Sequence, residues 1–251
     1  MSMRIMISPA KKMKVDTDSF PCRSLPQLLP KTEQLYERLR GMSYQELKAL
    51  WKCSDAIAKV NMERLETMDL RRNLTPAILA YEGIQYQYMA PGVFSDQALA
   101  YVEEHLRILS GFYGVLRPFD GVTPYRLEMQ AKLSMGQGKD LYSFWGDSIA
   151  ETLFSETDCI LNLASKEYSR CVSSHLNSRV KLITVSFCER KEGKLIEKGT
   201  LCKMARGEMV RYLAEHQIQD PEQIRDFHRL GYRFSPEESN DTTYAFIKEE
   251  P

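Results

Sequence analysis

The stretch Met3-Arg4-Ile5-Met6-Ile7-Ser8-Pro9 has the pattern of a short apolar strand that ends at Ser8-Pro9. Proline cannot donate a ladder hydrogen bond, so it commonly ends a strand. Two later runs, Cys159 to Leu163 and Val180 to Phe187, are apolar and partly β-branched, and they are predicted to be further core strands. Because helical patterns separate these strands, the sequence predicts an α+β fold in which helices flank a mixed sheet.

Helix signals lie between the strands. Ser43-x-x-Glu46 is a capping box that opens a predicted helix from Tyr44 to Trp51, and Ser54 can cap the next helix, Asp55 to Glu66. Further helices are predicted at 31–40, from Thr75-Pro76 onward, and at 96–107, 141–154, 201–216 and 221–229. The remaining predictions are a buried strand at 108–109, irregular chain at 110–128, a hairpin turn at 192–193 and a closing edge strand at 244–247.

Composition excludes several classes of protein. The 251 residues hold 34 Lys+Arg and 34 Asp+Glu, so a wholly basic nucleic-acid binder is excluded and any basic surface must be local. The six cysteines form no C-x-x-C pair, which argues against a disulfide framework and a zinc site. The first apolar run is too short for a signal peptide, and no run reaches membrane-span length. We therefore expect one cytoplasmic domain over residues 1–251, without metal, cofactor or membrane partner.

Basic side chains follow the first strand. Residues 1–14 hold four basic side chains and no acidic one, and Lys11 and Lys12 come just after Ser8-Pro9. In open α/β sheets, ligands bind in the crevice beyond the strand ends, and lysines there suit anions. An exposed basic loop without function explains the same residues.

The loop from Ser110 to Glu128 carries a dense polar load. Its charged side chains are Arg117, Asp120, Arg126 and Glu128, and Tyr125 adds a phenol among them. Long loops with such chemistry are often functional. Internal pairs between arginine and carboxylate, which would brace an irregular loop, are an equally good explanation.

Two later segments could also bind an anion. A strand ends at Ser165, and a helix beginning at Lys166, Glu167 and Tyr168 would present free N–H groups to a phosphate. Lys203 and Arg206 share one face of a predicted helix, within a region (181–211) of eight basic and four acidic residues. Ordinary helix capping and a solvated helix face are the structural alternatives.

Residues 41–68 fit the outline of a helix-hairpin-helix. In that motif, the hairpin presents backbone N–H groups to a DNA phosphate independently of sequence. The hairpin would be Lys52-Cys53-Ser54, which lacks the glycine that such hairpins normally contain. Any short helical hairpin would fit the same outline.

In their order along the chain, these segments resemble the YaaA family of bacterial peroxide-stress proteins. The longest shared runs are Ser110-Gly111-Phe112-Tyr113-Gly114-Val115-Leu116-Arg117-Pro118 and Pro124-Tyr125-Arg126-Leu127-Glu128-Met129. Shorter shared segments are Ile7-Ser8-Pro9-Ala10-Lys11, Ser54-Asp55, Asn162-Leu163-Ala164-Ser165, Glu167-Tyr168, Ala205-Arg206-Gly207 and Gly231-Tyr232. The resemblance covers essentially the whole chain.

The resemblance implies one α+β domain with a positively charged cleft and a helix-hairpin-helix, DNA binding, and a role in limiting iron-driven oxidative damage. It also implies that five basic residues surround the cleft: Lys11, Arg117, Arg126, Lys203 and Arg206. The chain departs from the family pattern at Tyr81-Glu82-Gly83-Ile84, where Phe-Lys-Gly-Asp is expected, and at Met204, where a lysine is expected. Two lysines are thereby lost, so we expect weaker DNA binding than the family implies.

Our leading hypothesis is a cytoplasmic oxidative-stress protein that binds double-stranded DNA through its phosphate backbone, without sequence specificity. The residues assigned to phosphate binding are Lys11, Lys12, Arg117, Arg126, Ser165, Lys166, Lys203 and Arg206, with Lys52 and Ser54 of the hairpin as a second contact. Lysines and arginines that bind phosphates release counterions, so binding should fall steeply with salt.

The alternative hypothesis is an enzyme that acts on a nucleotide or another small phosphorylated compound in the same cleft. Its acid and base groups would come from Asp120, Tyr125, Glu128, Glu167 and Tyr168. Phosphate binding alone does not require so many acidic and phenolic side chains, whereas general acid–base catalysis uses them. We favour a binding protein over an enzyme. A third hypothesis is redox sensing at Cys202, next to Lys203 near a helix start, although we expect an inert thiol.

Overall fold

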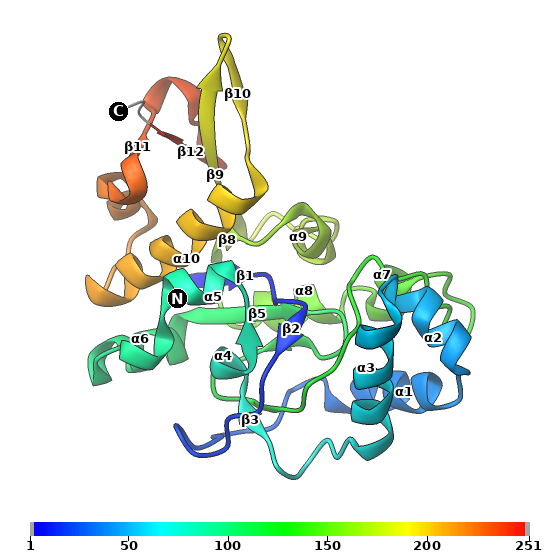
Figure 1. Ribbon diagram of the computed structural model, residues 1–251. Coiled ribbons are helices and arrows are strands. Elements are labelled where there is room, and N and C mark those ends of the chain that lie inside the picture. The colour runs from blue at the N-terminus through cyan, green and yellow to red at the C-terminus, as the bar shows by residue number, and fades with distance from the viewer. Residues whose placement is uncertain (1–2, 249–251) are drawn as a thin grey trace.

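The computed structural model describes residues 3–248 and centres on a mixed β-sheet (Figure 1). In this sheet β1 (Arg4–Ile7) lies between β5 (Leu106–Ser110) and β8 (Cys159–Leu163) and is parallel to both. Beyond β8 the sheet continues through two more parallel strands, β9 (Lys181–Lys191) and β12 (Thr243–Lys248). The predicted α+β fold, with helices flanking a mixed sheet, is confirmed.

Short antiparallel strands complete the sheet. They are β6 (Gly114–Leu116) beside β5 at one edge, β11 (Tyr232–Phe234) beside β12 at the other, and β10 (Lys194–Ile196) in a hairpin with β9. Two pairs of two-residue strands lie apart from it: β2 (Lys12–Met13) with β4 (Tyr81–Glu82), and β3 (Thr75–Pro76) with β7 (Gly121–Val122).

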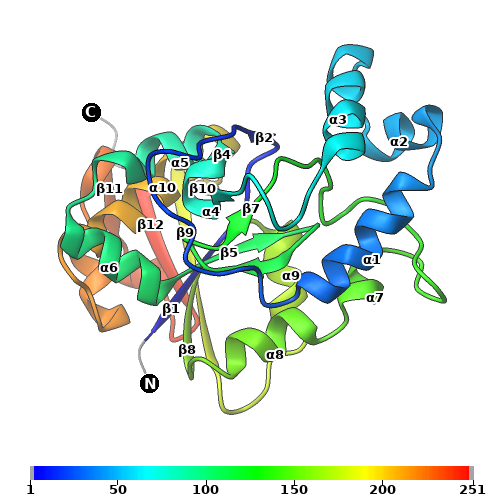
Figure 2. The same ribbon diagram turned by 90° about the horizontal axis from the view of Figure 1, so that it is seen from below.

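Helices cover both faces of the sheet, as Figures 1 and 2 show. On one face lie α6 (Asp96–His105) and α10 (Gly199–Glu215), with α5 (Ile84–Met89) packed against α10; on the other lie α8 (Ser148–Phe154) and α9 (Lys166–Ser173). The remaining α-helices are α1 (Leu29–Arg40), α2 (Tyr44–Trp51), α3 (Asp55–Thr67), α4 (Ala77–Ala80) and α7 (Leu141–Trp145). The 3-10 turns are η1 (Pro91–Val93), η2 (Pro221–Asp226), η3 (Arg229–Gly231) and η4 (Pro236–Glu238).

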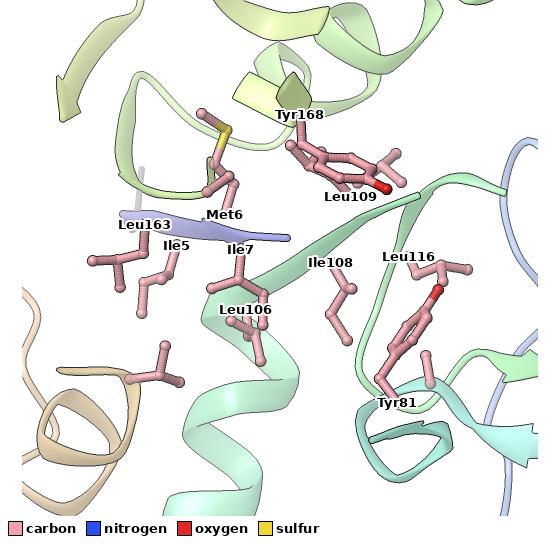
Figure 3. Close-up of a cluster of buried hydrophobic side chains, with 14 of the residues drawn as sticks. Ile5, Met6, Ile7, Tyr81, Leu106, Ile108, Leu109, Leu116, Leu163 and Tyr168 are labelled. Carbon is pink, nitrogen blue, oxygen red and sulfur yellow. The ribbon is translucent and has the colours of Figure 1, made fainter. Parts of the chain in front are cut away.

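Both faces of β1 are buried. Ile5 and Ile7 point toward the face covered by α6, whereas Met6 points toward the face where Tyr168 of α9 lies (Figure 3). All three β1 side chains are fully buried. A continuous apolar run is typical of a parallel strand covered by helices on both sides. This core fixes the position of the chain that follows β1, where Ser8 begins the candidate site.

Several element predictions were accurate because their signals are local. Strand β8 has the predicted bounds, and so has α2. The predicted capping box at the start of α2 is present: Ser43 Oγ accepts the N–H of Glu46, and Glu46 Oε2 accepts the N–H of Ser43 at 2.7 Å. The first helix begins slightly earlier than predicted, with a proline in its first turn.

Other predictions were wrong. The strand at 244–247 is not an edge strand, because β12 lies between β9 and the unpredicted β11. The single helix at 141–154 is two helices, interrupted at Gly146, whose φ of 55° is left-handed. Thr75-Pro76 pairs with β7 as a strand, and the helix predicted from there, α4, begins at Ala77 with Pro76 as its N-cap and is only four residues long. In place of a helix to residue 107, α6 ends at His105 and the chain continues as β5.

Candidate functional site

A pocket of about 400 Å³ opens at the carboxyl ends of β1 and β8. Ser8 follows β1 and Ser165 follows β8, and the two parallel strands place them side by side. The N–H of Ser165 donates to Ser8 Oγ at 2.8 Å, and the two hydroxyl oxygens are 3.3 Å apart. Tyr86 of α5 donates its hydroxyl proton to the carbonyl of Ser8 at 3.0 Å. These bonds fix the two strand ends as one wall of the pocket.

Five separate segments line this pocket. The lining residues are 8–12, 82–86, 125–128, Ser165 with Glu167 and Tyr168 from the start of α9, and Lys203 with Arg206 from α10. Five of these residues are basic (Lys11, Lys12, Arg126, Lys203, Arg206) and three are acidic (Glu82, Glu128, Glu167). The structure therefore brings together ten of the sequence-derived candidates, from segments nearly 200 residues apart.

One side of the pocket, which we call the cationic wall, consists of Gln85 on α5 and of Lys203 and Arg206 on α10. Gly207 brings the two helices together, because a Cβ built at this glycine would lie 2.1 Å from the carbonyl oxygen of Gln85. Only a residue without a side chain allows so close a crossing. Arg206 Nε and Gln85 Nε2 are both buried without a hydrogen-bond partner. Within residues 3–248, no carboxylate forms an ion pair with Lys203 or Arg206.

A second part of the lining, which we call the carboxylate wall, consists of Arg126, Glu128 and Glu167. Lys11 Nζ lies 2.8 Å from Glu128 Oε2, and Arg126 Nη2 lies 3.6 Å from Glu128 Oε1. Gly111 supports this wall from behind, since a Cβ there would lie 2.5 Å from the carbonyl oxygen of Leu127. Arg126 Nε is buried and, like the two nitrogens of the cationic wall, has no hydrogen-bond partner.

Glu167 differs from Glu128 in its surroundings. Burial raises the pKa of Glu167, and the nearby charge of Glu128 raises it further. The N–H of Gln130 donates to Glu167 Oε1 at 3.2 Å and offsets part of this rise in the pKa. Glu128, in contrast, is held between two cations. Two carboxylates in unlike environments are the usual arrangement for one proton donor and one proton acceptor.

The tyrosines behind the pocket form a buried hydroxyl chain. Tyr125 Oη lies 2.6 Å from Ser110 Oγ and 2.9 Å from Tyr81 Oη. Burial raises the pKa values of Tyr125 and Tyr168 well above the usual phenol range. Both phenols are therefore neutral at physiological pH, and they can donate or accept a hydrogen bond without serving as a strong base.

Two candidates lie elsewhere. Arg117 follows β6, which runs antiparallel to β5, so the chain emerges at the amino ends of the parallel strands, away from the pocket. There Arg117 Nη2 lies 3.6 Å from Glu156 Oε1. Asp120 is buried beside it, where it accepts Ser24 Oγ at 2.6 Å and the N–H of Arg117 at 2.8 Å. Neither residue lines the pocket, and neither forms the predicted internal pair of arginine and carboxylate side chains, because the partner of Arg117 is Glu156, outside the loop.

The other basic candidates are surface residues outside the pocket lining. Lys166 is exposed on the first turn of α9, next to Ser165. Lys52 and Ser54 are exposed in the connection between α2 and α3, where Lys52 adopts a left-handed φ of 45° in place of the usual glycine. At the start of α3, Asp55 Oδ1 accepts Tyr44 Oη and Lys48 Nζ, each at 2.8 Å. Whether this hairpin contacts DNA stays a prediction.

Sequence reasoning missed two contributors to the pocket. Gln85 lies on α5, a short helix that no pattern predicted. Gly207 was noted as part of a shared run, but its role at the helix crossing was not inferred. A glycine inside a long predicted helix was the available signal, because it costs helix stability unless close packing requires it.

Cys202 does not have the features of a redox sensor. It is 3% exposed, and its Sγ donates to the carbonyl of Phe187 at 3.2 Å. Burial raises the pKa of this thiol, which disfavours the reactive thiolate. For metals, no group of three or more His, Cys, Asp or Glu in residues 3–248 is arranged to hold an ion. Nor does any helix in that range have both the length and the apolar character to cross a membrane.

Fold and site together define a mixed α+β protein whose cation-rich pocket lies beyond the ends of its parallel strands. Comparison with known proteins gives a more specific result. A family model described as Peroxide stress protein YaaA matches residues 3–238.

Curated relatives match along nearly their whole length. A UPF0246 protein of Agathobacter rectalis is 54% identical over 244 residues, covering 97% of this chain and 98% of the relative. UPF0246 proteins of Lactiplantibacillus plantarum and Desulfitobacterium hafniense are each 51% identical, covering 98% of this chain and 99% and 98% of the relatives. The chain therefore belongs to the YaaA family of peroxide stress proteins.

Proposed function

We propose that this protein acts in peroxide defence in the cytoplasm by binding the phosphate backbone of DNA without reading base sequence. The observation that carries the proposal is the pair Lys203 and Arg206, which line the pocket without any acidic partner in the described chain. Unpaired cations at a surface opening attract polyanions. Lys11 and Lys12 add positive charge to the same opening, although each is also paired with a glutamate of the pocket.

DNA binding of this kind offers a route to protection from iron. Lysines and arginines that contact phosphates release the counterions condensed on DNA. Ferrous ions held near the phosphates would be released with them, so that peroxide would react with iron at a distance from the backbone. This route needs no metal site in the protein.

The test compares two charge reversals with a matched control. Lys203→Glu and Arg206→Glu should each weaken binding to a fluorescent duplex, measured by anisotropy at several salt concentrations, without lowering the melting temperature. Lys181→Glu is the control, because Lys181 is exposed at the amino end of β9, whereas the pocket opens at the carboxyl ends of the parallel strands. Plasmid nicking by ferrous iron and peroxide should be suppressed by the wild type and by the control, but less by the two pocket variants. Equal binding by all four proteins would reject the proposal.

A second candidate function is favoured by the carboxylate wall. Glu128 and Glu167 face the same pocket, and carboxylates within a DNA groove would repel the backbone. Such groups suit general acid–base chemistry on a small phosphorylated compound. Native mass spectrometry of the purified protein tests this directly: a retained nucleotide or sugar phosphate supports the enzyme, and a ligand-free mass at millimolar added nucleotide opposes it.

A further inference from the structure

Three buried nitrogen donors in the pocket have no partner within the described chain: Gln85 Nε2, Arg126 Nε and Arg206 Nε. Gln85 is only 6% exposed, so solvent does not compensate for the missing bond. Each buried unsatisfied donor costs about 1–3 kcal/mol. Seven buried side-chain atoms within residues 3–248 lack a partner, and three of the seven gather around this one pocket, where a bound anion could accept from all three.

We propose that the pocket is a binding site for the terminal phosphate of a small phosphomonoester, held between Gln85, Arg126 and Arg206. The inference goes beyond DNA binding and does not depend on it. A terminal phosphate has three free oxygens, one for each unpartnered donor group. A backbone phosphodiester has only two.

The charges of the two walls favour a phosphomonoester over a carboxylate. The cationic wall carries Lys203 and Arg206 with no neutralising carboxylate from residues 3–248, and Arg126 is only partly neutralised by Glu128 at 3.6 Å. A phosphomonoester carries nearly two negative charges at neutral pH. Arginine binds it through charge-assisted hydrogen bonds, which are stronger than neutral ones. A carboxylate would leave one donor and one positive charge without a partner.

The carboxylate wall restricts the rest of the ligand. Glu128 and Glu167 accept hydrogen bonds and repel a second anionic group, so the part of the ligand that faces them carries hydroxyl or amino groups. This excludes a diphosphate or triphosphate that extends across the pocket. A volume of about 400 Å³ lies at the lower end of the range for small-ligand pockets, which suits a sugar phosphate or a nucleoside monophosphate.

The experiment is isothermal titration calorimetry of the full chain with adenosine 5′-monophosphate, adenosine, adenosine diphosphate and inorganic phosphate. The monophosphate should bind more tightly than the diphosphate, inorganic phosphate should bind weakly, and adenosine should not bind. Gln85→Met and Arg206→Met should each weaken monophosphate binding about tenfold or more. Lys181→Gln, at the amino end of β9, should bind it as the wild type does. Absence of binding by every phosphate compound would overturn the inference, and so would pocket variants that bind the monophosphate as tightly as the wild type does.

Two further readouts separate this inference from DNA binding and from misfolding. Gln85→Met should melt no lower than the wild type in the absence of ligand, because the lost donor had no partner. The same variant should still bind duplex DNA. The DNA-binding proposal and the phosphomonoester proposal can therefore fail independently, because each has its own binding measurement. A 5′-phosphorylated oligonucleotide could bind more tightly than the monophosphate and lose that affinity in Gln85→Met. This result would show that the pocket binds the phosphate of a DNA end, and it would overturn the proposal of a small ligand.

Discussion

The two ends of the parallel strands use the same residue types in opposite ways. At the carboxyl ends, Lys203 and Arg206 line an open pocket without acidic partners among residues 3–248. At the amino ends, three arginines gather on one carboxylate: Arg4 and Arg107 reach Glu156 Oε2 at 3.2 and 2.7 Å, and Arg117 reaches Oε1 at 3.6 Å. Charges at the amino ends thus stabilise the fold, whereas charges at the carboxyl ends remain available to a ligand.

Removing Glu156 should have the largest effect on stability. In Glu156→Ala the arginines around it, above all the 5% exposed Arg107, lose their common counter-charge. Breaking a buried ion pair in this way costs about 3–5 kcal/mol. Urea denaturation should show this loss, while Glu151→Ala, an exposed residue of α8, should change stability little. A stability loss below about 1 kcal/mol would mean that the arginines find other partners.

Gly207→Ala should have the next largest effect and should act on the pocket as well. The new Cβ would lie 2.1 Å from the carbonyl oxygen of Gln85, so α5 and α10 must move apart. We expect a loss of about 1–3 kcal/mol, together with weaker DNA binding, since Arg206 would move with the helix. Gly199→Ala is the matched control in the same helix: a Cβ there meets nothing within 4 Å, and it should be neutral or slightly stabilising.

Neutralising the cationic wall should change binding without changing stability. The double variant Lys203→Gln, Arg206→Gln removes two phosphate contacts, so the slope of log K against log salt for duplex binding should fall by about 2. Neither residue has an ion pair to lose in the part of the chain that the structure describes, so the free energy of unfolding should stay within about 0.5 kcal/mol of the wild type. An unchanged slope would place the DNA contacts elsewhere on the molecule.

The smallest effect concerns the pH dependence of stability. Burial raises the pKa of Glu167 above its ordinary value of 4.5. As the pH rises past 4.5, the carboxyl therefore loses its proton in the unfolded chain before it does so in the folded protein, and the free energy of unfolding falls. Glu167→Gln removes this titration. The difference in unfolding free energy, variant minus wild type, should therefore increase as pH rises from about 4.5, by less than about 1 kcal/mol because the carboxyl is partly solvated. Glu237→Gln, exposed and unpaired by any bond the structure shows, should give a flat difference.

Local signals in the sequence predicted a large part of the fold. The capping box fixed the start of α2, and the apolar run fixed β8, because both depend on neighbouring residues. β11 has no such local signal, since only pairing with β12 makes it a strand, and its omission made β12 look like an edge. α5 is likewise held by contact with α10, more than 100 residues later.

The candidate site was predicted in part for the same reason. Lysines and glutamates that directly follow strands, such as Lys11 and Glu167, could be placed at one edge by the rule for parallel strands. Arg117 and Asp120 were misplaced because their position depends on the antiparallel return through β6. Gln85 carried no pattern at all and becomes informative only when its unpartnered nitrogen is seen in the pocket.

β1 connects the two ends of the sheet over only four residues. Arg4 at its start contacts Glu156, and Ser8, just after its end, accepts the N–H of Ser165, so the two contacts are separated by roughly 13 Å of strand. Deleting one residue from this strand would turn the following side chains to the opposite face. If the start of the strand kept its register, Ser8 would lose its bond with Ser165. If the end kept its register, Arg4 would lose its contact with Glu156. Length changes in this strand are therefore the least tolerated insertions or deletions of the fold, although every β1 side chain other than Arg4 is an ordinary apolar residue.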